Sequence, residues 1–311
     1  HATELMDEYS SLTEDALDEF DNLDLVMWPE SMFPAYDVLL ESNNPQLEPS
    51  LDMSTVLNNQ LAFRQLVKNG SRRLNSYATP GQPAGKTNWL LGTTTWRFGD
   101  HAPHRLNSAI LIDPQGQVNS RYYKMHPVMF GEYVPFGQRL PWLYRLTPMP
   151  NGLTSGDGPT SFDVAGLTMS PSICFENTMP HLIRRHVVQL AGEGKNVDVL
   201  VNLTNDGWFW GSSILDLQLD CAVFRSVELR RPFLIAANTG FSAWIDGNGL
   251  IRKQGPRRAT DNLLAEVTPD GRSSLYEYWG DWPAAICMLF CVVAGAIGFR
   301  DHRRRRAPTS V

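Results

Sequence analysis

Three residues that could do chemistry stand where predicted strands end. Glu30 follows the apolar run 23–28, and Lys124 directly follows the second strand of a predicted β-hairpin. Cys174 directly follows the apolar run 167–173. Strand ends that lie next to one another are the usual place for sites in α/β sheets. The positions therefore predict that a carboxylate, an ammonium and a thiol meet.

These three groups suit nucleophilic catalysis. A cysteine thiol is only a few per cent ionised near neutrality, so Cys174 needs a base to act as a nucleophile. A buried carboxylate can accept that proton, which makes Glu30 the candidate base. An ammonium at Lys124 would stabilise the thiolate and later the oxyanion of a tetrahedral intermediate.

Each residue also has a purely structural explanation. A lone cysteine at a strand end is most often a small core residue. Glu30 could cap a following helix, and Lys124 could be a solvated lysine at a sheet edge. Taken one at a time, the residue types do not separate these explanations from catalysis.

The elements that must position these residues alternate between strand-like and helical runs. An acidic amphipathic helix opens the chain. Turn residues at 113–116 and at Gly166 predict two hairpins. Further helices are expected over 56–67, 181–191 and 215–229, and strands over 23–28, 90–95, 107–112, 117–123, 161–165, 167–173, 197–203, 233–237, 242–245 and 250–253. This mixture predicts a single α/β domain with much antiparallel pairing.

Composition excludes several classes of protein. Lys and Arg number 27 against 33 Asp and Glu, a net charge of −6, so a nucleic-acid partner is not expected. The four cysteines form no CxxC or Cys/His cluster, so we expect neither a disulfide scaffold nor a metal site, and no cofactor. Cys221 lies among apolar residues of a predicted helix and indicates packing. Cys287 and Cys291 lie inside the apolar run 282–299 and are expected to face lipid or to pack.

The run 282–299 carries no charge, and its 18 residues at 1.5 Å rise nearly cross the ~30 Å hydrocarbon core of a bilayer. Arg300 and Arg303 to Arg306 follow it. The positive-inside rule then puts the C-terminus in the cytoplasm and everything before Trp282 on the other side. A buried core helix and a basic nucleic-acid patch are the alternatives.

Taken together, the motifs resemble a known family. Trp28-Pro29-Glu30, Tyr123-Lys124 and the segment 173–176 follow the order and spacing of the nitrilase, or carbon–nitrogen hydrolase, superfamily, which uses a Glu-Lys-Cys triad. More narrowly, the segment 124–136 resembles the lysine loop of bacterial apolipoprotein N-acyltransferases. Later motifs of that family are matched at 202–209, 225–232 and 238–243, so the resemblance covers roughly 23–299.

The resemblance implies a four-layer α-β-β-α sandwich over 1–281, a transmembrane helix over 282–299 and a basic cytoplasmic tail over 300–311. The catalytic domain would face the periplasm from the bacterial inner membrane. Glu30 would be the general base, Lys124 the stabiliser and Cys174 the nucleophile. Glu132 and Glu176 match supporting glutamates, and Phe175 stands where these acyltransferases usually carry Tyr.

The resemblance also implies the substrates. A fatty acyl group would pass from a phospholipid donor to the amine of a diacylglyceryl-cysteine apolipoprotein, by way of a thioester. Aromatic residues in loops with Gly and Pro are the expected lipid contacts: Phe130, Tyr133, Phe136, Trp208 and Phe209. The alternatives are a membrane-tethered amidase and an inactive domain that binds lipid or lipoprotein.

One implication concerns the start of the chain. Family members have several membrane helices and a first core strand ahead of the helix with which this sequence opens. We therefore expect a fragment, or a short form completed by a partner chain, with an open sheet edge.

Overall fold

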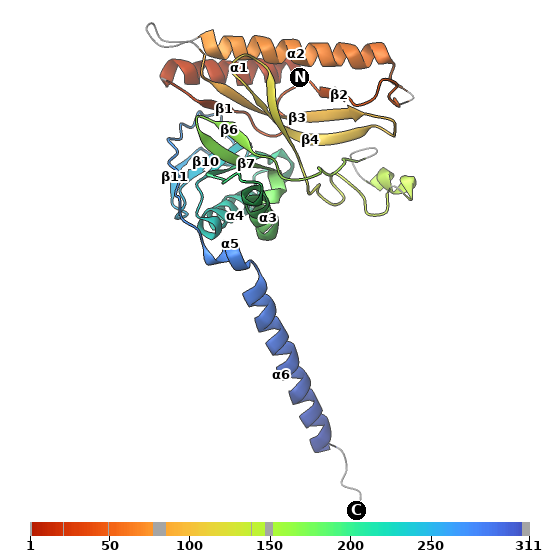
Figure 1. Cartoon of the computed structure of the whole chain (residues 1–311), viewed down its shortest axis with the longest axis vertical. Coiled ribbons are helices and arrows are strands. Elements are labelled where there is room, and N and C mark those ends of the chain that lie inside the picture. The colour runs from red at the N-terminus through yellow and green to blue at the C-terminus, as the bar shows by residue number, and fades with distance from the viewer. Residues whose placement is uncertain are drawn as a thin grey trace, which may run out of the picture.

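The computed structural model describes residues 2–20, 22–48, 50–76, 85–137, 139–146 and 152–306. Figure 1 shows two β-sheets facing one another, with helices on the outer face of each. This confirms the predicted four-layer α-β-β-α sandwich. The hairpins and long helices expected from the sequence are present. Most boundaries shift by a few residues, but the helix expected over 56–67 continues to Ser76.

The first sheet contains five strands: β1 (Leu25–Met27), β2 (Asp37–Leu40), β3 (Asn88–Phe98), β4 (His104–Ile112) and β5 (Val118–Tyr123). They run in the order β1-β3-β4-β5. Both β1 and β2 pair in parallel with the same edge of β3, β1 near its start and β2 near its end. The strand β2 was not predicted. It begins with a buried aspartate, Asp37, and acidic residues are rare in strands, so the sequence pattern did not indicate one. In the structure, Asp37 Oδ2 accepts a hydrogen bond from Arg121 Nε at 2.6 Å.

The second sheet has the order β11-β10-β9-β8-β7-β6. Its strands are β6 (Phe162–Val164), β7 (Leu167–Ile173), β8 (Val199–Asn205), β9 (Phe233–Asn238), β10 (Ala243–Ile245) and β11 (Ile251–Gln254). The central strands β7, β8 and β9 are parallel. They are connected by the helices α3 (Pro180–Gly192) and α4 (Ile214–Leu229). Their carboxyl ends therefore lie at one edge of the sheet.

Side chains alternate along the central strands and divide the interior into layers. In β3, Leu90 belongs to the core between the sheets, and Leu91 packs toward the helices outside. In β8, Val199 and Val201 face the first sheet while Leu200 packs with α3 and α4 residues. The strand period of two thus produces separate cores on both faces of each sheet.

The outer face of the first sheet is covered by α1 (Ala2–Glu19) and α2 (Met53–Ser76) (Figure 1). Aromatic rings pack there edge to face, with 4.8 Å between the centroids of Trp28 and Trp89. The indole Nε1 of Trp28 donates to Thr13 Oγ1 at 3.0 Å, which attaches α1 to the end of β1. This packing holds the chain just ahead of Glu30.

One edge of the first sheet is open in the described part of the chain. The strand β1 pairs only with β3 there, and no described strand lies along its other edge. A cavity of about 280 Å³ lies beside that edge, between α1, β1 and the segments 236–242 and 255–263.

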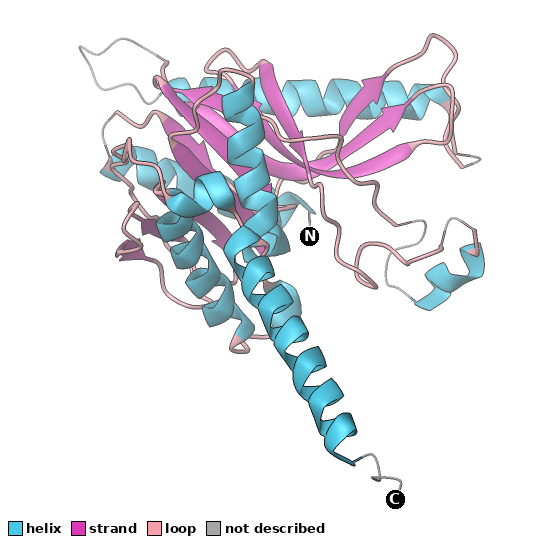
Figure 2. Cartoon of the chain, turned by 60° about the horizontal axis from the view of Figure 1, so that its bottom comes forward, coloured by secondary structure: helices cyan, strands magenta, loops and turns pink. Residues whose placement is uncertain are grey.

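The chain leaves the sandwich through a short helix, α5 (Leu275–Trp279), and a long one, α6 (Trp282–Arg306). Figure 2 shows α6 extending away from the rest of the molecule. Its segment Trp282–His302 is long and apolar enough to cross a membrane, and none of it is buried against the protein. Three short 3₁₀ helices occur in loops: η1 (Pro141–Leu146), η2 (Cys174–Thr178) and η3 (Gly207–Phe209).

Gly92 in β3 allows the segment carrying Glu30 to lie directly on the strand. A Cβ atom at this position would stand 2.3 Å from Pro29 O and 2.5 Å from Glu30 Cα. Real Cβ atoms do not approach backbone this closely, so any side chain here must displace Glu30. This glycine is therefore a positional requirement of the site.

We predict that Gly92→Ala lowers the free energy of unfolding by about 1–3 kcal/mol or more, because backbone atoms cannot move aside as a flexible side chain can. Thermal unfolding of the detergent-solubilised protein measures the loss. Gly192→Ala is the matched control, since a Cβ there has nothing within 4 Å, and its effect should stay within about 0.5 kcal/mol. Equal stability of both variants would contradict the close approach.

Candidate active site

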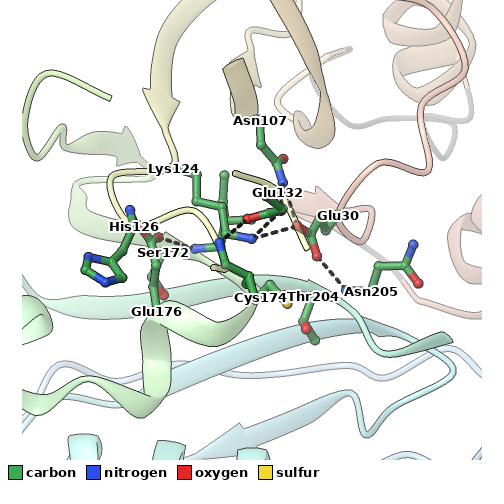
Figure 3. A network of polar contacts seen from close by, with 12 residues as sticks. Glu30, Asn107, Lys124, His126, Glu132, Ser172, Cys174, Glu176, Thr204 and Asn205 are labelled. Carbon is green, nitrogen blue, oxygen red and sulfur yellow. Dashed lines mark hydrogen bonds and ion pairs between the residues drawn. The ribbon is translucent and has the colours of Figure 1, made fainter. Parts of the chain in front are cut away.

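The three residues singled out from the sequence lie together between the sheets. Glu30 lies in the turn beyond β1, Lys124 directly follows β5, and Cys174 directly follows β7. Figure 3 shows Glu30, Lys124 and Glu132 pointing toward one another, with Cys174 beside them on the side of the second sheet. The sandwich therefore brings residues from both sheets into one cluster.

Lys124 is at the centre of this cluster. Its side chain is 1% exposed, which excludes a solvated edge lysine. The Nζ atom lies 2.8 Å from Glu132 Oε1 and 3.4 Å from Glu30 Oε1. Burial alone would lower the pKa of Lys124, but the negative charges of Glu30 and Glu132 outweigh it and raise that pKa above its usual range. The ammonium is therefore charged at any physiological pH.

Besides Lys124, Glu30 is held by donors from two strands, β4 and β8. Its Oε1 accepts from Asn107 Nδ2 at 2.6 Å, and its Oε2 accepts from the backbone N–H of Asn205 at 2.9 Å. These contacts fix the carboxylate in the cluster and leave no role as a helix cap.

Glu132 completes the charge balance from a turn in the lysine loop. Its Oε2 accepts from the backbone N–H of Val128 at 2.7 Å, and its Oε1 receives Lys124 Nζ. Asn107 Nδ2 lies 3.4 Å from the same Oε1. Two carboxylates therefore share one ammonium and one amide.

Cys174 has an unusual backbone conformation. Its φ angle is +52°, in the left-handed region that a non-glycine residue adopts only when its surroundings enforce it. It is the first residue of η2, and Asn202 Nδ2 donates to its carbonyl at 3.3 Å. The strained turn directs the Cys174 side chain toward the residues between the sheets. A cysteine that only filled the core would not require this strained conformation.

The thiol of Cys174 is neutral at rest. Burial raises its pKa well above the ordinary range, and the negative charge of Glu30 raises it further. The charge of Lys124 and a hydrogen bond with Thr204 act in the opposite direction. A thiolate at Cys174 would therefore form only by proton transfer to a base, rather than exist as a stable group.

Glu176 connects the turn at Cys174 to the lysine loop. Its Oε1 accepts from the backbone N–H groups of Met125 and His126, at 2.7 and 3.0 Å. Its Oε2 accepts from Ile173 N at 2.7 Å and from the Tyr122 hydroxyl at 2.8 Å. Burial raises the pKa of Glu176 to about 7, although these donors favour the charged form. Its position indicates a structural role.

The aromatic residues expected to contact lipid lie in loops. Phe130, Phe136 and Trp208 are exposed, while Tyr133 and Phe209 are half-buried. Both Phe130 and Phe136 have positive φ angles. Phe175, beside the nucleophile, is 42% exposed, so its ring does not fill the core.

Similar proteins were identified at the level of family, sequence and structure. Residues 2–276 match the carbon–nitrogen hydrolase family. The chain belongs to this family. An apolipoprotein N-acyltransferase of Geobacter metallireducens is 33% identical over 277 residues, covering 89% of this chain and 46% of that protein. The one from Rhodopirellula baltica is 30% identical over 282 residues, covering 85% and 48%.

The chain thus spans about half the length of the curated relatives it matches. Among solved structures, an amidase from Nesterenkonia sp. has a TM-score of 0.52 at 15% identity, over 82% of this chain and 80% of the amidase. At that identity the likeness concerns the carbon–nitrogen hydrolase fold alone. Among the described residues, no group of three or more His, Cys, Asp and Glu side chains is placed to hold a metal ion.

Several residues of this carbon–nitrogen hydrolase site were not predicted from the sequence. Asn107 belongs to β4, and its carbonyl pairs with Lys124 N at 2.9 Å, so the hairpin register places it opposite the lysine. Counting outward from the predicted turn at 113–116 could have found it. Thr204 is the last residue but one of the apolar strand β8, and Asp206 directly follows that strand, the same signal that pointed to Cys174.

Thr204 and Asp206 form a buried pair next to Cys174 (Figure 3). The Thr204 hydroxyl donates to Asp206 Oδ1 at 2.8 Å and lies 3.3 Å from Gln218 Oε1. Burial raises the pKa of Asp206 to about 6, and the charge of Glu30 adds to that rise. The hydroxyl has a single proton, so it lowers the pKa of Cys174 when it donates to the sulfur in place of Asp206.

We predict that Thr204→Val raises the pKa of Cys174, because the thiolate loses this hydrogen bond. Alkylation of Cys174 by iodoacetamide at pH 8 should slow about tenfold, as expected for about 1.4 kcal/mol from a hydrogen bond to a charged group. Peptide mass spectrometry separates Cys174 from the other cysteines. Thr204→Ser retains the hydroxyl and should react at nearly the original rate. If the valine and serine variants react alike, the hydroxyl does not act on the thiol.

Proposed function

We propose that this chain is the catalytic part of an apolipoprotein N-acyltransferase. It transfers a fatty acyl group from a phospholipid to the N-terminal amine of a diacylglyceryl-cysteine lipoprotein, through a thioester on Cys174. The observation that carries the proposal is the identity of 30–33% to curated proteins of that name over 85–89% of this chain. The buried cluster of Glu30, Lys124 and Cys174 supplies the groups that such a reaction needs.

The acylation step follows from the charges in the cluster. Glu30 accepts the Sγ proton as Cys174 attacks the ester carbonyl carbon of the phospholipid. The ammonium of Lys124 stabilises the oxyanion of the tetrahedral intermediate. The C–O bond then breaks, Glu30 returns the proton to the leaving oxygen, and the lysophospholipid departs.

The second half-reaction uses the same groups. The lipoprotein amine attacks the thioester carbonyl, and Lys124 again stabilises the oxyanion. The C–S bond breaks, Glu30 takes the amine proton, and that proton passes to the sulfur of Cys174. Atoms and charge balance over the cycle without a further reactant.

A lipid substrate agrees with the surface around the site. Exposed aromatic side chains occur in the lysine loop, in η1 and beside η3: Phe130, Phe136, Trp142, Trp208 and Trp210. Exposed apolar groups are a common feature of binding surfaces for apolar ligands. We assign lipid contact to Phe130, Tyr133, Phe136, Trp208 and Phe209.

We further propose the arrangement in the membrane. Residues 1–281 form the catalytic domain, 282–299 span the inner membrane, and 300–311 form a basic cytoplasmic tail. The arginines after the apolar run support this orientation through the positive-inside rule, which puts the catalytic domain in the periplasm.

The amidase alternative has weaker support. It rests on likeness of fold at 15% identity, and an amidase acting on a small molecule needs neither α6 nor exposed aromatic loops. The inactive alternative is disfavoured by the complete set of Glu30, Lys124 and Cys174. Assays with an amine acceptor and with water alone separate transfer from hydrolysis.

The acyl-enzyme provides the direct test. Incubation of the full-length protein with phospholipid should add the mass of one fatty acyl group to the intact protein. The adduct should be absent in Cys174→Ala and present in Cys221→Ala, the matched control from α4. An adduct that maps to Cys221 instead would refute the assignment of the nucleophile.

Substitutions of Glu30 and of Lys124 should shift the pKa of Cys174 in opposite directions. Loss of either costs on the order of 10²–10³ in rate or more, so rates alone cannot separate their roles. The pH dependence of Cys174 alkylation can. Lys124→Met should raise the pKa of Cys174, because a stabilising positive charge is lost, and Glu30→Gln should lower it, because an opposing negative charge is lost.

The exposed Lys195 provides the control for this measurement, since Lys195→Met changes the net charge equally without touching the site. In Lys195→Met, the pH dependence of Cys174 alkylation should coincide with that of the protein without substitutions. If Lys124→Met also leaves the profile unchanged, then Lys124 does not act on the nucleophile and the triad proposal fails.

A further inference from the structure

The short helix α5 carries an apolar face that packs against nothing in the described structure. Leu275, Tyr278 and Trp279 are spaced i, i+3 and i+4, so they share one side of the helix. Their exposed fractions are 75, 69 and 61%. Trp282, the first residue of α6, is 72% exposed. Large side chains grouped in this way indicate a contact surface rather than chance exposure.

The opposite side of α5 is firmly attached to the catalytic domain. Tyr276 packs against the core between the second sheet and its helices, and Glu277 pairs with Arg231 at 3.7 Å. Ser274 caps the helix by accepting from Glu277 N at 3.1 Å, and its hydroxyl donates to the carbonyl of Glu228 in α4. These contacts prevent α5 from rotating to bury its apolar face.

Arg184 of α3 strengthens the attachment. Its Nε donates to the carbonyls of Tyr276 and Glu277 at 2.8 and 3.0 Å, and its Nη2 donates to that of Tyr278 at 2.9 Å. The last carbonyls of a helix lack partners within the helix, so the guanidinium satisfies them. Gly280 has φ +56° and passes so near that a Cβ would stand 2.9 Å from Arg184 Cζ. The junction to α6 is therefore held rather than loose.

Building on the proposed membrane span of α6, on which this inference rests, we infer that Leu275, Tyr278 and Trp279 lie in the interfacial layer of that phospholipid bilayer. The apolar segment of α6 begins at Trp282, three residues after Trp279, so α5 lies at the level where that segment enters the membrane. Tyr and Trp favour this layer, where the ring meets lipid and the polar group meets water. The Tyr278 hydroxyl retains a polar partner, Ser273 Oγ, at 3.3 Å.

This contact has a mechanical consequence. With α5 fixed to α3 and α4 on one side and to lipid on the other, the catalytic domain cannot swing freely about α6. Its orientation to the bilayer surface is set by the fold, whatever reaction the site performs.

Photo-crosslinking tests the inference. Benzoylphenylalanine replaces Tyr278, or Leu275 as a second site, in the full-length protein carrying Cys174→Ala and placed in nanodiscs of phosphatidylethanolamine and phosphatidylglycerol. Both side chains are exposed, so the replacements preserve the fold. The probe at Phe290 in α6 is the positive control, and the probe at Leu250, exposed between β10 and β11, is the negative one.

We expect lipid adducts at positions 278, 275 and 290, several-fold above position 250. Adducts at 290 without adducts at 278 and 275 would overturn the inference, as would crosslinks from 278 and 275 to protein alone. Absence of lipid adducts at 290 would overturn the membrane span and the inference together. None of these outcomes depends on acyl transfer, because the reactive cysteine is absent.

Discussion

The buried ammonium of Lys124 is the charge on which the site depends. A positive charge out of water is stable only beside compensating negative groups, and removing one partner of such a buried pair costs about 3–5 kcal/mol. The compensation comes from Glu30 and Glu132, which belong to separate segments. The requirement therefore fixes the turn after β1 and the turn of the lysine loop relative to β5.

The same charge balance explains how a buried thiol can react. With the thiol neutral, the two carboxylates and one ammonium carry a net charge of −1. A thiolate formed by release of a proton to solvent would make it −2, which burial opposes and which raises the pKa of Cys174. A proton that moves from Cys174 to Glu30 leaves the net charge at −1. The cluster thus favours transfer within the site over ionisation, which suits a nucleophile that must wait for its substrate.

The surroundings of the cluster divide into a rigid part and an exposed part. Glu176, fully buried with four donors, links the strained turn at Cys174 to the start of the lysine loop. Beyond that anchor, the loop exposes Phe130 and Phe136 to solvent. Precise geometry is maintained where the chemistry would occur, and apolar groups are exposed where a lipid chain would approach. Arg184 attaches α5 to the catalytic domain. This attachment sets the orientation of the site relative to the bilayer that α6 is proposed to cross.

The sequence by itself determined the elements and the principal candidates. The strand period of two, the turn residues at 113–116 and Gly166, and the chargeless run after Trp282 are local patterns, and local patterns determine strands, hairpins and an apolar helix. Strand ends also pointed to Glu30, Lys124 and Cys174. Only the tertiary structure decided the rest. Strand β2, with its buried Asp37, depends on a partner 84 residues away. Asn107, Thr204 and Asp206 became part of the site only when strand register and the facing of two sheets brought distant segments together. Hydrogen bonds between such segments leave no periodic trace in the chain, because their geometry exists only after the sheets have paired and packed.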